Sequence, residues 1–174
     1  MNNYNWDAQE IIPGVYLGSV FAANNIQELN KRNITCVLDL SGEIIKHKGI
    51  QYCCFKNIND SPNQPMIHLF PTALAFITYC NKNNYNIIIN CYAGISRSST
   101  IIAAYLIHYN NSTVKDAIGY LRTKRYKVNP NPGFILELEK FIYNDHHIIQ
   151  DKIDKECYNF DNNLPVTEYK PLIN

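Results

Sequence analysis

A cysteine, an arginine and several small residues share one short run that could bind and attack a phosphate group. Cys91 follows the apolar run Ile87–Ile89, and Gly94 and Arg97 come three and six positions after the cysteine. Backbone N–H groups of a tight loop and the N-terminus of the next helix attract an anion, and a guanidinium binds two phosphate oxygens. The same positive field favours the thiolate, which is the reactive form of cysteine. The run therefore predicts a phosphate site with a nucleophile at its floor.

The alternative is a buried structural cysteine at a strand end, since cysteine is among the residue types most often buried. With Gly94, Ser96 and Ser98 also required at fixed offsets, the whole pattern arises by chance on the order of once in several thousand. We therefore favour the nucleophile.

The surrounding elements must place Cys91 at the carboxyl end of a strand. Short apolar runs predict strands at 15–17, 36–40, 52–58 and 87–90. Apolar residues at helical spacing predict helices at 22–31, 65–81, 98–109, from Ser112 or Thr113, and from Pro132, with a kink or a start near Pro71. This alternation predicts a single α/β domain with a central, mostly parallel sheet flanked by helices on both faces. Such sheets bind ligands at the carboxyl ends of their strands.

Residues 151–174 change in character, being polar, containing two prolines and showing no clear period. We expect a catalytic domain over residues 1–150 and a C-terminal extension over 151–174 that is packed on the surface or disordered.

The composition predicts a globular chain without a strongly charged or membrane-spanning character. It has 174 residues, of which 46% are hydrophobic and 18% charged, and a net charge of +1. These values indicate no nucleic-acid or membrane partner. None of the six cysteines has zinc-site spacing, so we expect no metal or other cofactor. Unpaired thiols suit a reducing compartment, so we expect a cytoplasmic location that can extend to the nucleus.

The run Cys91–Ser98 resembles the phosphate loop of the cysteine-dependent protein phosphatases, most closely that of the dual-specificity branch. Ile12–Ser19 is similar to the first strand of that family, Ala104–Ile107 to its helix after the loop, and Pro130–Phe134 to the segment that opens its last core helix. These segments follow the family's order over roughly residues 8 to 145. The resemblance implies a small, atypical dual-specificity phosphatase with the protein-tyrosine-phosphatase fold and a phosphorylated protein as substrate. It would hydrolyse phosphotyrosine and phosphoserine or phosphothreonine.

Phosphoester hydrolysis through cysteine assigns a role to each loop residue. Cys91 would form a phosphocysteine intermediate, and Arg97 with the loop N–H groups would hold the phosphate. By the resemblance, Ser98 donates a hydrogen bond to the departing sulfur, although it could also be a plain helix N-cap. The expected substrate-binding loop residues are Tyr92, Ala93, Gly94, Ile95 and Ser96.

The reaction also needs a general acid for the departing oxygen. Asp60, in the polar run Asn59–Asn63, precedes Cys91 by 31 residues, and the resembled family places its acid on such a loop at a similar separation. The alternative is an aspartate that merely stabilises a turn. Asp39 lies within an apolar strand and is predicted to be structural.

One residue departs from the family pattern. Asn90 stands where the family usually has a histidine immediately before the nucleophile. Asparagine donates and accepts hydrogen bonds but carries no charge. We expect it to stabilise the thiolate less well and to slow turnover.

Five further positions have open alternatives. Arg122 and Arg125 are either a solvated helix end or a basic rim that attracts an acidic substrate. Asn131 either orients the phosphate loop, as in the resembled family, or caps the helix that begins at Pro132. The pair Cys53–Cys54 is predicted to be buried in a strand, with capture of oxidised Cys91 as a disulfide as the weaker alternative.

The sequence leaves two other functions open. A catalytically weak phosphopeptide-binding module is one, because Asn90 replaces the usual histidine. The other is an RNA 5′-phosphatase or lipid-directed phosphatase of the same superfamily, although the loop side chains Tyr92, Ala93 and Ile95 are uncharged.

Overall fold

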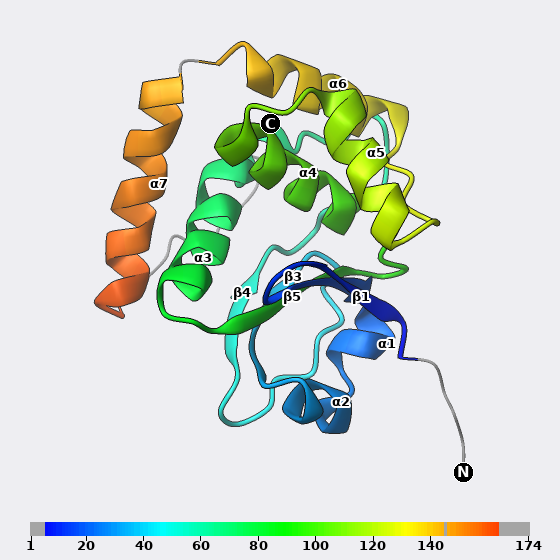
Figure 1. The fold of residues 1–174 in the computed structure, drawn as a ribbon, viewed down its shortest axis with the longest axis vertical. Coiled ribbons are helices and arrows are strands. Elements are labelled where there is room, and N and C mark those ends of the chain that lie inside the picture. Colours follow the sequence, from blue (N-terminus) through cyan, green and yellow to red (C-terminus); the bar gives the residue numbers. More distant parts are fainter. Residues whose placement is uncertain (1–5, 145, 164–174) are drawn as a thin grey trace.

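The computed structural model describes residues 6–144 and 146–163, and within them the chain forms one five-stranded sheet (Figure 1). The strand order is β1-β2-β5-β3-β4, and all neighbours are parallel except β1 and β2. The strands are β1 (Ala8–Ile12), β2 (Val15–Ser19), β3 (Ile34–Asp39), β4 (Gln51–Cys54) and β5 (Asn86–Cys91). The predicted mostly parallel α/β fold is therefore confirmed.

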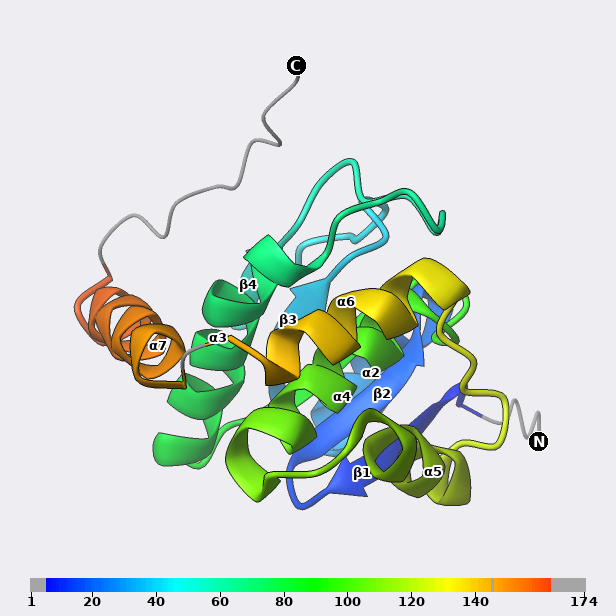
Figure 2. The ribbon, with the colours of Figure 1, turned by 90° about the horizontal axis from the view of Figure 1, so that it is seen from above.

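Helices cover both faces of the sheet, as Figures 1 and 2 show. One face carries α1 (Val20–Ala23) and α2 (Ile26–Lys31). The other carries α3 (Phe70–Lys82), α4 (Arg97–Asn110), α5 (Val114–Lys124) and α6 (Pro132–Ile142). The last helix, α7 (His146–Asp161), packs along α3.

The composition of β5 explains its central place. Ile87, Ile88 and Ile89 are fully buried, and alternate residues face opposite sides of a strand. Ile87 and Ile89 join the larger core under α3 and α4, whereas Ile88 joins the smaller core under α1 and α2. A strand that is apolar on both faces must lie between two helical layers. This requirement puts Cys91 at the carboxyl end of the central strand.

Several element boundaries differ from the predictions. The edge strand β1 was not predicted, because only Ala8 and Ile11 of its five residues are buried and it lacks a strand-like alternation. The predicted helix 22–31 is two short helices, since Asn25 caps the start of α2 by accepting a hydrogen bond from the Glu28 N–H. The predicted strand 52–58 ends at Cys54. Pro71 lies in the first turn of α3, so the helix starts near this residue rather than kinking there.

The C-terminal region is more regular than expected. Residues 151–161 continue α7, and the boundary proposed at residue 150 falls inside this helix. Ile149, Ile153 and Cys157 are buried at intervals of four residues, and the Cys157 thiol donates to the Ala75 carbonyl of α3 at 3.3 Å. The polar residues between them hid this apolar stripe. Residues 164–174 lie outside the described residues.

Candidate active site

The loop after β5 turns back sharply against the neighbouring strand. Gly94 has a φ of +64°, and a Cβ atom at this position would lie 2.5 Å from the Gly18 carbonyl group of β2. No other residue type fits here without displacing backbone. The loop is therefore packed against β2, the strand beside β5, and it covers the buried side chain of Cys91 at the end of β5.

Donors outside the loop satisfy each of its carbonyl groups. The C=O of one residue and the N–H of the next belong to the same trans peptide unit and point in opposite directions. Because each loop carbonyl points outward to its donor, the N–H group of the following residue points toward the interior of the loop. The contacts are Val20 N–H to Tyr92 O (3.1 Å), Arg125 Nη2 to Ala93 O (3.1 Å), Arg125 Nε to Gly94 O (2.8 Å), Asn129 N–H to Ile95 O (2.9 Å), and Thr100 N–H to Ser96 O (3.0 Å). The geometry is that of an anion-binding cradle.

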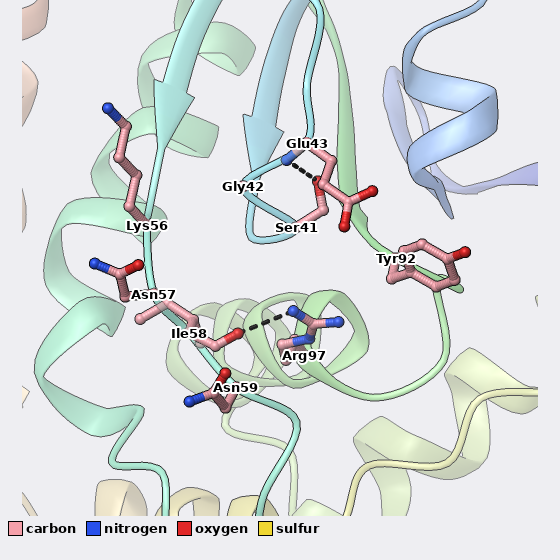
Figure 3. Close-up of a pocket in the computed structure, with 9 residues that line it drawn as sticks. All are labelled: Ser41, Gly42, Glu43, Lys56, Asn57, Ile58, Asn59, Tyr92 and Arg97. Carbon is pink, nitrogen blue, oxygen red and sulfur yellow. Dashed lines mark hydrogen bonds between the residues drawn. The ribbon is translucent and has the colours of Figure 1, made fainter.

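Arg97 is held along one edge by backbone. Its Nη1 donates to the carbonyl of Leu40, directly after β3, at 3.0 Å. It also donates to the carbonyl of Ile58, in the segment after β4, at 2.9 Å (Figure 3). Its Nε is buried and has no hydrogen-bond partner among the described residues. A buried, unpaired donor costs about 1–3 kcal/mol. The fixed guanidinium thus offers a free donor to an anion.

Ser98 contacts the nucleophile directly. Its hydroxyl donates to the Cys91 sulfur at 3.2 Å, and both side chains are buried. The N-cap position of α4 is occupied by Ser96, so the alternative of Ser98 as the N-cap is wrong.

Asp60 lies at the mouth of the loop. Its Oδ1 accepts hydrogen bonds from Ser96 Oγ and Asn131 Nδ2, both at 2.7 Å. Both contacts end on Oδ1. Asn131 also caps α6, since its Oδ1 accepts from the Phe134 N–H at 3.1 Å. The two alternatives for Asn131 therefore hold together.

Both alternatives for Arg125, a solvated helix end and an exposed basic rim, are wrong. Its side chain is 2% exposed and lies behind the loop, where it pairs with Asp7 at 3.0 Å in addition to the loop carbonyls. Burial raises the pKa of Asp7, but the Lys127 hydrogen bond and the Arg125 charge outweigh this effect, so the pKa lies below its usual value. Arg125 positions the loop rather than contacting substrate. Arg122 holds the Val128 carbonyl at 2.9 Å.

A buried carboxylate contacts Asn90, the residue immediately before the nucleophile. Asp39 accepts hydrogen bonds from the N–H groups of Ser41 (2.9 Å) and Gly42 (3.0 Å) and from Asn90 Nδ2 (2.7 Å). Asp39 and Asn90 are both fully buried, so Asp39 has the structural place predicted for it. The Asn90 Oδ1 atom has no partner among the described residues.

The other cysteines stay away from the reactive loop. Since β3 separates β4 from β5, Cys53 and Cys54 lie about two strand spacings, roughly 10 Å, from β5. A disulfide needs Cα atoms within about 7 Å, so the alternative of a trap for oxidised Cys91 is wrong. Burial also raises the pKa of Cys53 above its ordinary value.

A cavity of about 450 Å³ borders Arg97 and Tyr92, as Figure 3 shows. Its other walls are the segments 41–43 and 56–59, which were not predicted to line the site. The Tyr92 ring is half exposed at the rim and meets the Phe21 ring edge to face at 5.8 Å. Among the described residues no group of metal-ligating side chains is present, and none of their helices is long and apolar enough to cross a membrane.

The site and fold can now be compared with known proteins. The family model "Dual specificity phosphatase, catalytic domain" matches residues 15–144. The chain belongs to this family. It is 33% identical over 133 residues to dual specificity protein phosphatase 22 of Xenopus tropicalis, covering 76% of this chain and 63% of that protein. It is 30% identical over 139 residues to the human protein of the same name, covering 79% and 75%. The chain thus spans less than two thirds of the frog relative's length.

Solved structures with the same fold support this assignment. The crystal structure of DUSP15 has a TM-score of 0.80 at 27% identity and covers 87% of this chain and 97% of its own. The human tyrosine phosphatase-like serine/threonine/tyrosine-interacting protein has a TM-score of 0.74 at 27% identity, covering 79% and 96%. The resemblance noted in the sequence is confirmed.

Two glycines should respond oppositely to the same substitution. A Cβ at Gly133 would lie 2.0 Å from the Pro62 carbonyl oxygen, next to the Asp60 loop, whereas one at Gly119 in α5 would meet nothing within 4 Å. Gly133→Ala should cost about 1–3 kcal/mol, as overpacking does. Gly119→Ala should stabilise by about 0.5–1 kcal/mol, because alanine favours the helix. Thermal melts of the two variants check this, and a Gly133→Ala protein as stable as wild type would contradict the packing.

Proposed function

We propose that this chain is a cysteine-dependent protein phosphatase that hydrolyses phosphotyrosine and phosphoserine or phosphothreonine through a phosphocysteine intermediate. The observation that carries the proposal is Arg97, held on one edge by two carbonyls while its buried Nε has no partner. The loop of residues 92–96 joins Cys91, the last residue of β5, to Arg97, the first residue of α4. A phosphate dianion would satisfy the donor and meet the sulfur.

In the first step the Cys91 thiolate attacks phosphorus and forms a sulfur–phosphorus bond. The ester oxygen departs with the bonding electron pair and takes a proton from Asp60, so the phosphoresidue leaves as a free hydroxyl. The hydrogen bonds from Ser96 and Asn131 to Oδ1 fix the carboxyl at the mouth of the loop.

In the second step a water molecule attacks the phosphorus of phosphocysteine. The Asp60 carboxylate takes the water's proton, the sulfur–phosphorus bond breaks and inorganic phosphate forms. The sulfur departs as a thiolate, and the Ser98 hydroxyl, which donates to it at 3.2 Å, stabilises this charge.

Arg97 and the loop N–H groups act in both steps. Charge in phosphoryl transfer spreads over the three equatorial oxygens of the transferring group. The N–H groups of residues 93–97 and the Arg97 fork are fixed before substrate arrives, so no reorganisation is needed as this charge develops.

A phosphopeptide-binding module with weak catalysis is the second candidate. Asn90, with its unpartnered Oδ1, favours it, because no charged group replaces the family's usual histidine beside Cys91. A phosphatase-like interacting protein also shares the fold. Turnover, as opposed to binding alone, distinguishes the two candidates.

Hydrolysis of an aryl phosphate, measured without metal and with reductant, tests the proposed function. Cys91→Ser should abolish turnover, and Arg97→Ala should reduce kcat by about 10³-fold because two charge-assisted contacts disappear. Arg32→Ala is the matched control, since this arginine pairs with Glu28 on α2. Turnover that survives in Cys91→Ser would contradict the proposal. Phosphopeptide binding by a wild type without turnover would favour the binding module.

The role of Asp60 predicts a dependence on the leaving group. Asp60→Asn keeps an oxygen that accepts the hydrogen bonds of Ser96 and Asn131, but an amide has no acidic proton to transfer to the leaving group. It should slow hydrolysis of phenyl phosphate by about 10²-fold or more and hardly affect nitrophenyl phosphate, whose leaving group needs little protonation. Asp116→Asn, in the first turn of α5, serves as the control. Equal slowing of both substrates in Asp60→Asn would remove Asp60 from this role.

A further inference from the structure

An apolar groove begins at Asp60 and runs along the start of α6. Its volume is about 620 Å³. Asp60 and Ser96 line its inner end, and its apolar walls come from Ile95, Pro130, Pro132, Ile135 and Leu136. Leu136 is 62% exposed, although it is a large apolar side chain.

Most polar groups of the groove already have partners within the protein. Asp60 Oδ1 accepts from Ser96 and Asn131, and Asn129 Oδ1 accepts from Arg122 at 3.2 Å. The surface left for a ligand along α6 is therefore mainly apolar. Because Asp60 and Ser96 of the candidate active site also line this groove, we expect the substrate of that site to occupy it.

The opposite side of the site has a different character. The cavity beside Arg97 is lined mainly by polar side chains, those of Ser41, Glu43, Lys56, Asn57 and Asn59, together with Ile58 and Tyr92 (Figure 3). A large apolar side chain of the substrate would therefore find a matching surface on the α6 side.

The length of the groove sets which substrate residue reaches it. Five residues of helix separate Asn131, at the mouth, from Leu136, which corresponds to about 7.5 Å along α6. Two residues of an extended peptide span nearly the same length, about 6.6 Å. Side chains two positions apart in an extended chain point to the same side, so both the phosphoresidue and this neighbour would face the enzyme.

We propose that the groove binds a large apolar side chain located two positions from the phosphoresidue of a protein substrate. The inference rests on the proposed function and names its substrate class. It makes Leu136 a specificity-determining residue.

Paired phosphotyrosine peptides test the proposal. The peptides are identical except for Leu or Ala two positions before the phosphotyrosine in one pair and two positions after it in the other. The Leu peptide of one pair should have a kcat/KM about tenfold higher in wild type, which corresponds to burying most of one leucine side chain. In Leu136→Ala this ratio should fall to near one. Tyr158→Ala removes a side chain with the same 62% exposure on α7 and should keep the wild-type ratio.

Three results would overturn the proposal. One is a ratio near one for both pairs in wild type, and another is a Leu preference that Leu136→Ala retains. The third is a wild-type dimer that Leu136→Ala separates in sedimentation, because a second copy would then cover the groove. If wild type hydrolyses no peptide, the proposed function fails separately. In that case the Kd values of the Leu and Ala peptides are compared in Cys91→Ser and in Cys91→Ser/Leu136→Ala. A preference for the Leu peptide that is present in Cys91→Ser and lost in the double variant would support the groove, and any other result would overturn it.

Discussion

The phosphate loop depends on one constraint: its carbonyl groups must bond outward so that its N–H groups can point inward. A loop at a buried strand end cannot leave carbonyls without donors, and α1, α4, Arg125 and the segment before α6 supply them. Arg125 does most here, because one guanidinium binds the carbonyls of both Ala93 and Gly94. Asp7 in turn balances its buried charge. The cradle is therefore formed before any anion arrives.

Hydrogen bonds to groups on other elements also fix the side chains of Arg97, Asp60 and Asp39. Arg97 is held by carbonyls that follow two different strands, so its position depends on the whole sheet rather than on α4 alone. Asn131 caps α6 and binds Asp60 with the same side chain, which ties Asp60 to the helix start. Asp39, buried behind the nucleophile, is satisfied by the turn after β3 and by Asn90. Arg97, Asp60 and Asn90 thus each have a partner that is remote in sequence.

This remoteness explains what the sequence could and could not predict. The run around Cys91 was predicted well, because strand, loop and helix follow one another within a few residues. Arg125 was misplaced, since its partner Gly94 lies 31 residues away and a basic helix end gives no sign of burial. The contact of Asn90 with Asp39 spans 51 residues and was equally invisible. The helix α7 was missed because one buried residue in four makes a weak periodic signal.

The central claim is that the loop presents a phosphoryl group to Cys91, and a trapped intermediate tests this most directly. The wild-type enzyme would be mixed with excess aryl phosphate, quenched with acid within milliseconds and digested for mass spectrometry. The account predicts a phosphoryl group on the peptide containing Cys91, formed in wild type and missing in Cys91→Ser and Arg97→Ala. Turnover without phosphate on this cysteine, or phosphate on another residue, would contradict the account.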